Sequence, residues 1–282
     1  ARIDPKIYLR RFALTSDLLV GHGIEIGAGD NPQKLPDGAS CIYFDKRDKQ
    51  DLQVLFQARL DYEVHLIDEI QAFFPDGASF LIAHNVLEHS PDPIGLLRSW
   101  FSFVRNDGMI VLSLPDKNHL PEDAMRIVPP IDHLILDHLF SRGEDTFESK
   151  EHLYSFLFGW RDKIYPHLDK AGYCDHALAE PHRSGHDLHW HAFDRLLCEK
   201  VIQTAGLLSG KDIDMVRICY PESSIFSTFG EVIYIFRVRR RTQEAVSYVD
   251  KVLPEIQRIA DYLSSGARSL SNALQTWSQG GR

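Results

Sequence analysis

A glycine turn near the N-terminus offers the clearest chemistry in this sequence. Residues 24–30 read Ile-Glu-Ile-Gly-Ala-Gly-Asp, so an apolar stretch runs directly into Gly27 and Gly29. Glycine tolerates positive φ and lets the backbone approach a bound ligand closely. Asp45 ends the next apolar stretch about twenty residues on, where a carboxylate accepts hydrogen bonds from ribose hydroxyls. Because the turn is not GxGxxG and no basic residue stands ready for a pyrophosphate, we expect a nucleoside without phosphates.

Histidines beside carboxylates form the second group of residues that could do chemistry. A histidine oriented by a carboxylate can take the proton of a hydroxyl nucleophile, which typically contributes about 10²–10⁴-fold in rate. The candidate general bases are His119, His133, His189 and His191, with Asp116 beside the first of them in sequence.

Two other interpretations of these histidines stay open. A divalent metal held by His and Asp could bind a sugar diol and acidify one hydroxyl. No HExxH or similarly compact signature supports such an ion, so we assign no metal ligands. Surface loops also collect His and Asp without any function.

The spacing of apolar segments predicts the elements that position these residues. Short apolar strands alternate with helices or long connections, which is typical of a parallel sheet covered on both faces. We expect strands at 23–26, 41–44, 64–67, 80–83, 109–114, 214–219 and 231–238. Helices are expected within 1–20 and at 93–104, 131–139 and 192–206, the last ending at Gly206 as its C′ residue. The fold class is therefore α/β, with a Rossmann-like, seven-stranded, mostly parallel sheet flanked by helices.

Composition and charge restrict the partners of the chain. The 282 residues are 44% hydrophobic and 25% charged, as in an ordinary globular protein. A net charge of −9 disfavours nucleic acid as a partner. No apolar run approaches the ~20 residues of a membrane span, and residues 1–11 lack a signal-peptide core, so we expect a cytoplasmic location. The four cysteines are scattered, which argues against a disulfide scaffold or a cysteine-rich zinc site.

Several segments together resemble class I S-adenosylmethionine-dependent methyltransferases with the "VLEH" signature. Residues 24–29 are similar to the first motif of that family, and Asp45 matches the acidic residue that ends the second strand. Residues 67–80 resemble the adenine-side segment, and residues 85–89 (Asn-Val-Leu-Glu-His) resemble the signature after the fourth strand. Leu-Pro-Asp-Lys at 114–117 resembles the end of the fifth strand. The likeness covers about the first 120 residues in the order and spacing of the family.

This resemblance implies a site for S-adenosylmethionine, with S-adenosylhomocysteine as the product. The implied contacts are Glu25 and the backbone of Gly27, Ala28 and Gly29 for the methionine portion, Asp45 for the ribose, Lys46, Asp68 and Glu69 for the adenine side, and Asn85 and Val86 around the sulfonium. We interpret Glu88 and His89 as the N-terminus of a helix, where a carboxylate favours the positive end of the dipole.

The resemblance also implies an organisation and an acceptor. Residues 1–240 would form the methyltransferase domain, with a substrate cap inserted at about 116–190, and residues 241–282 a helical tail or linker. Relatives with a Pro-Asp-Lys strand end and a histidine-rich insert accompany, or are fused to, glycosyltransferases. The implied acceptor is therefore a hydroxyl oxygen of a sugar or glycan. Alternatives are a small-molecule O- or N-methyltransferase acting on a phenol or natural product, and a non-catalytic S-adenosylmethionine-binding module.

Overall fold

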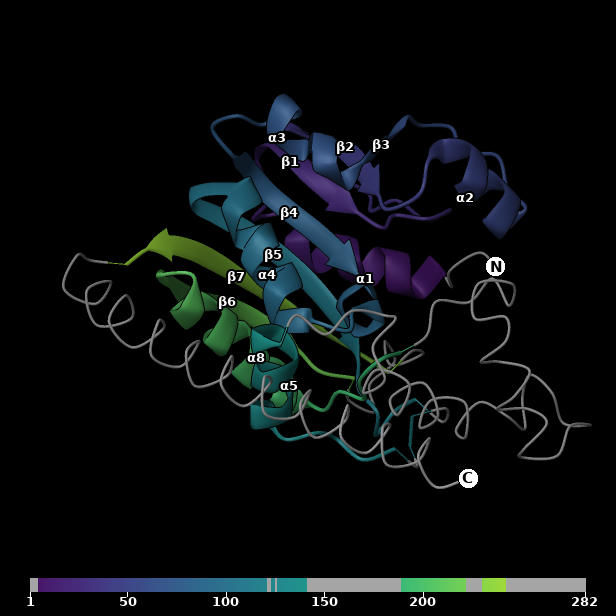
Figure 1. Ribbon diagram of the computed structural model, residues 1–282. Helices are drawn as coiled ribbons and strands as arrows, with labels where there is room; N and C mark the ends of the chain where they lie inside the picture. The colour runs from purple at the N-terminus through teal and green to yellow at the C-terminus, as the bar shows by residue number, and fades with distance from the viewer. Residues whose placement is uncertain (1–4, 121–122, 125, 141–188, 222–229, 242–282) are drawn as a thin grey trace, which may run out of the picture.

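The protein folds around one twisted sheet with helices on both faces (Figure 1). The computed structural model describes residues 5–120, 123–124, 126–140, 189–221 and 230–241. Most of the predicted cap and all but the first residue of the predicted tail lie outside these ranges, so both remain predictions.

Seven strands form the sheet in the described part of the chain, in the order β3-β2-β1-β4-β5-β7-β6. Their bounds are β1 Gly21–Ile26, β2 Ala39–Asp45, β3 Val64–Leu66, β4 Ala78–His84, β5 Val104–Pro115, β6 Lys211–Cys219 and β7 Glu231–Arg240. β1 to β5 pair in parallel, whereas β7 runs antiparallel to both β5 and β6. The predicted Rossmann-like, mostly parallel sheet is therefore confirmed.

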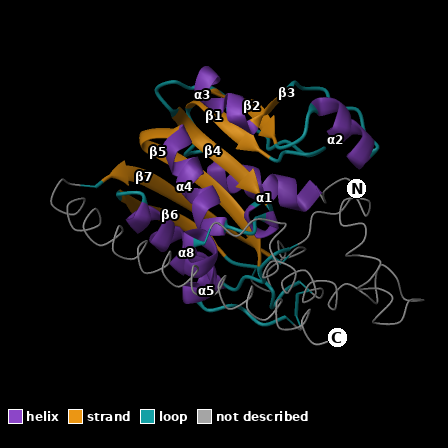
Figure 2. Cartoon of the chain, viewed as in Figure 1, coloured by secondary structure: helices purple, strands orange, loops and turns teal. Residues whose placement is uncertain are grey.

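The two faces of the sheet are covered by different helices (Figure 2). The larger core lies under α4 (Pro93–Phe103), α5 (Ile131–Leu139) and α8 (Arg195–Leu208). The other face has a smaller apolar cluster around Phe80, Ile82 and Val111. This face also carries α1 (Pro5–Thr15), whose buried side chains are mostly polar. Helix α1 buries two arginines, Arg10 and Arg11, rather than an uninterrupted apolar stripe.

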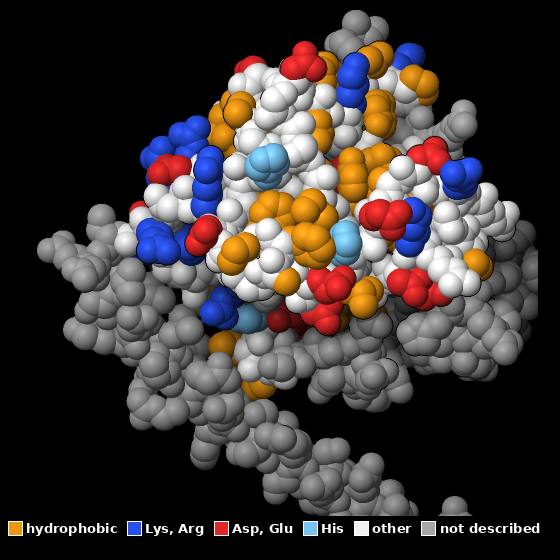
Figure 3. Space-filling model, turned by 90° about the horizontal axis from the view of Figure 1, so that it is seen from above, with side chains coloured by type: hydrophobic (Ala, Val, Ile, Leu, Met, Phe, Trp, Pro, Cys, Tyr) orange, Lys and Arg blue, Asp and Glu red, His pale blue; other side chains and the backbone are white. Residues whose placement is uncertain are grey.

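The outer part of the sheet, beyond β2, carries only short helices. α2 (Lys49–Phe56) and α3 (Ile70–Phe73) flank β3 there, and a 3₁₀ turn, η1 (Ile67–Glu69), follows β3 directly. Figure 3 views this edge from above and shows hydrophobic side chains among interspersed acidic and basic ones. Leu66 and Phe73 are among the exposed apolar residues of this edge.

Helix α8 begins and ends differently from the sequence prediction. Asp194 caps its N-terminus by accepting a hydrogen bond from the amide of Leu197, so the helix starts at Arg195 and not at residue 192. Gly206 lies inside the helix rather than after it, so the prediction of a C′ glycine there is wrong. A Cβ at Gly206 would come within 2.5 Å of Ile213 Cγ1, so glycine is needed for close packing of α8 on β6.

Among the described residues, no helix has both the length and the apolar character to cross a membrane.

Close packing at Gly206 predicts a local stability effect. Gly206→Val should lower the free energy of unfolding by about 1–3 kcal/mol, because the added side chain overpacks against Ile213. Leu207→Val changes the exposed neighbour in the same helix and should stay within about 0.5 kcal/mol of the wild type. Urea unfolding measures both; equal losses in the two variants would contradict this packing role.

Candidate functional site

The turn after β1 is built to expose backbone at the carboxyl edge of the sheet. Gly27 and Gly29 adopt φ values of 68° and 60°, which L side chains rarely reach. A Cβ on Gly27 would lie 2.7 Å from a methyl group of Val86, which follows β4. The hydroxyl of Tyr62 donates a hydrogen bond to the carbonyl oxygen of Gly29. The predicted glycine turn is thus held between the ends of β1 and β4.

Glu25 stabilises this turn from below. Its carboxylate is buried in β1 and accepts a hydrogen bond from the amide of Gln33, at 2.9 and 3.1 Å from the two oxygens. Burial raises the pKa of Glu25 to about 7, against the lowering effect of that hydrogen bond. The side chain that was predicted to hold the methionine portion of the cofactor therefore holds the loop that follows Gly29.

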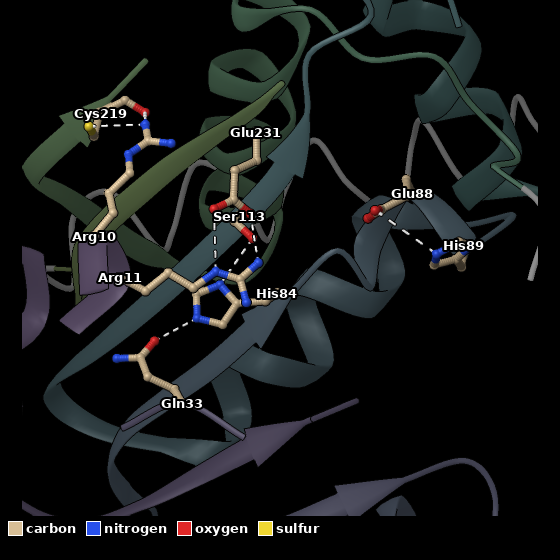
Figure 4. Close-up of polar contacts among 9 residues, drawn as sticks. All are labelled: Arg10, Arg11, Gln33, His84, Glu88, His89, Ser113, Cys219 and Glu231. Atoms are coloured by element: carbon tan, nitrogen blue, oxygen red, sulfur yellow. Dashed lines mark hydrogen bonds and ion pairs between the residues drawn. The ribbon is translucent and has the colours of Figure 1, made fainter. Parts of the chain in front are cut away.

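Gln33 connects this loop to α1, β4 and β5 (Figure 4). Its side-chain amide donates to the hydroxyl of Thr15 at 2.7 Å, so its carbonyl oxygen faces Nε2 of His84 at 2.6 Å. Nδ1 of His84 in turn lies 3.0 Å from the Ser113 hydroxyl. Burial lowers the pKa of His84 well below its usual range. A neutral ring with its proton on Nε2 satisfies every contact in the chain.

A buried ion pair completes the polar layer under α1. Arg11 donates to both carboxylate oxygens of Glu231, at 3.3 and 2.7 Å, and both side chains are almost fully buried. Arg10 donates to the carbonyl of Tyr220 at 3.1 Å. This polar layer was not predicted from the sequence, although a signal was present. Glu25 and Ser113 interrupt apolar strands, His84 ends β4 and Glu231 begins β7.

The residues predicted for ribose and adenine follow β2 and β3. Asp45 ends β2, and its carboxylate accepts a hydrogen bond from the amide of Arg47 at 3.1 Å. Lys46 and Asp68 are exposed. The Glu69 carboxylate accepts from the amide of Leu66 at 2.9 Å and so caps η1. Asp45 and Asp68 thus lie at the same sheet edge as the glycine turn, since β1, β2 and β3 are parallel neighbours.

Asn85 and Val86 lead from β4 into a 3₁₀ turn, η2 (Leu87–His89). Asn85 is exposed with a φ of 52°, and its amide donates to the carbonyl of Ser113 at 3.0 Å. Asn tolerates this left-handed conformation better than most residues. The side chain predicted to lie beneath the sulfonium is thereby presented at the edge, next to Val86 and Gly27.

Glu88 lies in the first turn of the short helix η2 and not at the N-terminus of α4. Helix α4 begins later and is capped by Asp92, which accepts from the amide of Gly95 at 2.8 Å. Glu88 is instead 1% exposed, and neither of its carboxylate oxygens has a hydrogen-bond partner among the described residues. Burial raises the pKa of Glu88 well above its usual range, against the lowering effect of its own backbone amide, and the nearby Asp123 raises it further. Nε2 of His89 lies 4.0 Å from one of these oxygens.

His189 and His191 turn to different carboxylates. Nδ1 of His189 lies 2.8 Å from Asp123, which also accepts from Arg126 at 2.9 Å. Nε2 of His191 lies 3.1 Å from Asp137, in a fully buried position. His189 and His191 are only two residues apart, but they do not share a carboxylate partner.

The remaining predicted histidines also pair with carboxylates. Nε2 of His133 lies 3.2 Å from the same oxygen of Asp137 that His191 approaches. Nδ1 of His119 lies 3.5 Å from Asp116, whose other oxygen accepts from the backbone and side chain of Asn118. Each candidate base thus has an orienting carboxylate, and the rings of His119, His133 and His189 are partly accessible.

No family model matches the sequence, and no curated protein matches it. Among solved structures, the CurJ carbon methyltransferase is 15% identical, with a TM-score of 0.39 over 82% of this chain and 52% of that one. The present chain thus spans about half the length of the CurJ protein.

Two further solved structures are similar over most of their own length. A putative S-adenosylmethionine-dependent methyltransferase from Listeria monocytogenes is 9% identical, with a TM-score of 0.44 over 84% of this chain and 99% of that one. The N-methyltransferase NodS from Bradyrhizobium japonicum WM9 is 11% identical, with a TM-score of 0.41 over 84% and 95%. Likeness of this degree says nothing of the reaction.

Burial of Glu25 predicts a pH-dependent stability. Its folded pKa of about 7 exceeds its ordinary 4.5, so between these values the folded protein keeps a proton that the unfolded chain releases. This group therefore lowers the free energy of unfolding as pH rises through that window, by roughly 3 kcal/mol in full. Glu25→Gln keeps an acceptor for the Gln33 amide and removes the titration.

The measurement is urea unfolding at several pH values between 4.5 and 7. The stability of Glu25→Gln relative to the wild type should increase with pH across this range. Asp37→Asn, at an exposed position, should run parallel to the wild type. Parallel curves for Glu25→Gln as well would show that the buried carboxyl does not titrate there.

Proposed function

We propose that this chain is an S-adenosylmethionine-dependent methyltransferase. The observation that supports this most is the meeting of four features at one sheet edge: the glycine turn after β1, Asp45 after β2, Asp68 after β3 and Asn85 after β4. Open α/β sheets bind ligands outside the carboxyl ends of their strands. An acidic residue after β2 suits a ribose diol.

The residues at this edge fit such a cofactor. A Cβ at Gly27 would meet Val86, and one at Gly29 would lie 3.0 Å from Phe56. Only glycine therefore fits at these two positions, and a ligand at this edge can lie close to the backbone of the turn. Asp45 would accept hydrogen bonds from the ribose, Asp68 would lie near adenine, and Asn85 beneath the sulfonium. The bound cofactor supplies a methyl group on a positively charged sulfur, a good electrophile for an oxygen nucleophile.

We further propose that the acceptor is a hydroxyl group of a sugar or glycan. A hydroxyl needs a proton acceptor, and a histidine held by a carboxylate suits that role. His119, His133 and His189 are the accessible candidates, whereas buried His191 is placed to position Asp137. The net charge of −9 favours a neutral polyhydroxylated acceptor over a polyanion. A cytoplasmic location and association with a glycosyltransferase belong to the same proposal.

Cofactor binding tests the first part of the proposal. Asp45→Asn should raise the Kd for S-adenosylmethionine and S-adenosylhomocysteine by about 10–100-fold, because hydrogen bonds to a charged acceptor contribute about 1.5–3 kcal/mol. Isothermal titration measures this, with Asp37→Asn as the control of equal charge change. A wild-type protein that binds neither compound contradicts the proposal, and unchanged binding in Asp45→Asn contradicts the ribose role.

Methyl transfer tests the second part. Tritium from labelled S-adenosylmethionine should appear in sugars or glycans rather than in phenols or amines. Replacing the histidine that accepts the proton by alanine should lower kcat by about 10²–10⁴-fold and remove the acidic limb of the pH–rate profile, with cofactor affinity retained. If the His119, His133 and His189 variants all keep the wild-type profile, proton transfer to these three histidines is excluded. If only amines are labelled, the acceptor atom is a nitrogen and the proposal of a sugar hydroxyl is wrong.

A further inference from the structure

Glu88, His89 and His189 form a compact cluster, of which the methyltransferase proposal uses only His189, as a candidate base. One donor atom from each of the three side chains lies within 4.8 Å of the others. The two imidazole rings face each other edge-on, with their centroids 5.0 Å apart. Figure 4 shows Glu88 and His89 side by side after β4, apart from the polar layer around Arg11 and His84.

The carboxylate of Glu88 is the observation that points to a ligand. It is 1% exposed and has no hydrogen-bond partner among the described residues, while it lies against His89. An unpaired buried carboxylate is costly, and proteins compensate buried charges by pairing or by metal coordination. Arg11 is engaged with Glu231 and Arg126 with Asp123, so neither guanidinium neutralises Glu88.

His189 is held by a carboxylate, as metal-binding histidines usually are. Nδ1 contacts Asp123, and Asp123 is held by Arg126, which also donates to the carbonyl of Trp190 at 3.1 Å. The amide of Trp190 donates to the carbonyl of Glu88 at 2.8 Å. A carboxylate on one ring nitrogen orients an imidazole and raises its basicity, as is usual for metal-binding histidines. The contacts of Asp123, Arg126 and Trp190 thus fix His189 beside Glu88.

From this geometry we propose that Glu88, His89 and His189 bind one divalent cation. Two imidazoles and one carboxylate favour ions such as Mn²⁺, Co²⁺ or Zn²⁺ over Ca²⁺, which takes oxygen ligands. Three protein ligands leave positions for oxygen atoms of a second molecule.

The cation would lie close to the proposed cofactor, because Val86 contacts Gly27 two residues before Glu88. Resting on the proposed function, this position assigns a vicinal diol as the acceptor, with both of its oxygens bound to the ion. The ion would lower the pKa of the hydroxyl that is methylated. Its proton would pass to solvent or to His119 or His133, and its oxygen would take the methyl group as the bond from that carbon to the sulfonium sulfur breaks. His189 is then a metal ligand and not the base.

A second cluster, His133, Asp137 and His191, serves as the internal comparison. There one oxygen of Asp137 lies 3.2 and 3.1 Å from the two imidazoles, so the carboxylate is already paired. The carboxylate of this second cluster is thus paired without an ion, whereas neither oxygen of Glu88 has a hydrogen-bond partner among the described residues.

Metal binding is tested on the full chain after removal of bound metal by a chelator, with Co²⁺ as the spectroscopic probe. The wild type should bind one Co²⁺ with a saturable visible absorption band, displaced by Zn²⁺. Glu88→Gln and His189→Gln should weaken binding at least tenfold, and Asp123→Asn by about 10–100-fold through His189. His133→Gln, in the second cluster, should bind as the wild type does.

Each contrary outcome has a definite meaning. Absence of saturable Co²⁺ binding, or equal affinity in Glu88→Gln, overturns the proposal and leaves Glu88 as a neutral buried carboxyl. Loss of binding in His133→Gln alone overturns it in favour of the second cluster. Thermal unfolding without metal checks that Glu88→Gln, which is nearly the same shape, still folds.

Activity separates this inference from the proposed function. With the cation removed, S-adenosylmethionine should still bind while methyl transfer to a diol falls at least a hundredfold and returns with Mn²⁺ or Co²⁺. Full transfer in the metal-free protein overturns the catalytic role of the ion but not methyltransferase activity. Metal binding without any cofactor binding instead contradicts the proposed function and leaves the cation site standing.

Discussion

The hydrogen-bond chain through Gln33 is the interaction on which the candidate site depends. Its amide donates to Glu25, its side chain donates to Thr15, and its carbonyl oxygen accepts from His84. These contacts join the loop after β1 to α1 and to the neighbouring strand. Because each group is buried, loss of one partner leaves another unsatisfied, which costs about 1–3 kcal/mol. The glycine turn therefore has a rigid support.

The two faces of the sheet are stabilised differently: one is packed with apolar side chains, and the other also contains buried polar groups that support the candidate site. Under α4, α5 and α8 the core is apolar and is stabilised by area removed from water. Under α1 the apolar cluster gives way to Arg11, Glu231 and the Gln33 chain. Polar groups in such a layer are satisfied only in one arrangement, so they order the strand ends more strictly than apolar packing does.

Carboxylate–histidine pairs recur above the carboxyl edge, but they are not equivalent. His119 and His133 pair with carboxylates near them in sequence, at i,i+3 and i,i+4, and both are partly accessible. His189 contacts Asp123, which is 66 residues away, and lies beside the buried carboxyl of Glu88, which has no hydrogen-bond partner in the described chain. Proton transfer suits the first kind of pair, and cation binding suits the second.

The sequence by itself determined the class of fold and which residues lie at the carboxyl edge of the sheet. Side-chain periodicity predicted the strands, and the need for positive φ predicted the turn at Gly27 and Gly29; the structure has both. Local rules also produced an error: Gly206 is of a residue type that often ends helices, yet it lies inside α8. Only the tertiary structure decided that Gly206 meets Ile213, that Glu88 is buried, and which carboxylate each histidine contacts. These contacts join residues far apart in the chain, and their energies depend on burial, which the order of residue types along the chain does not reveal.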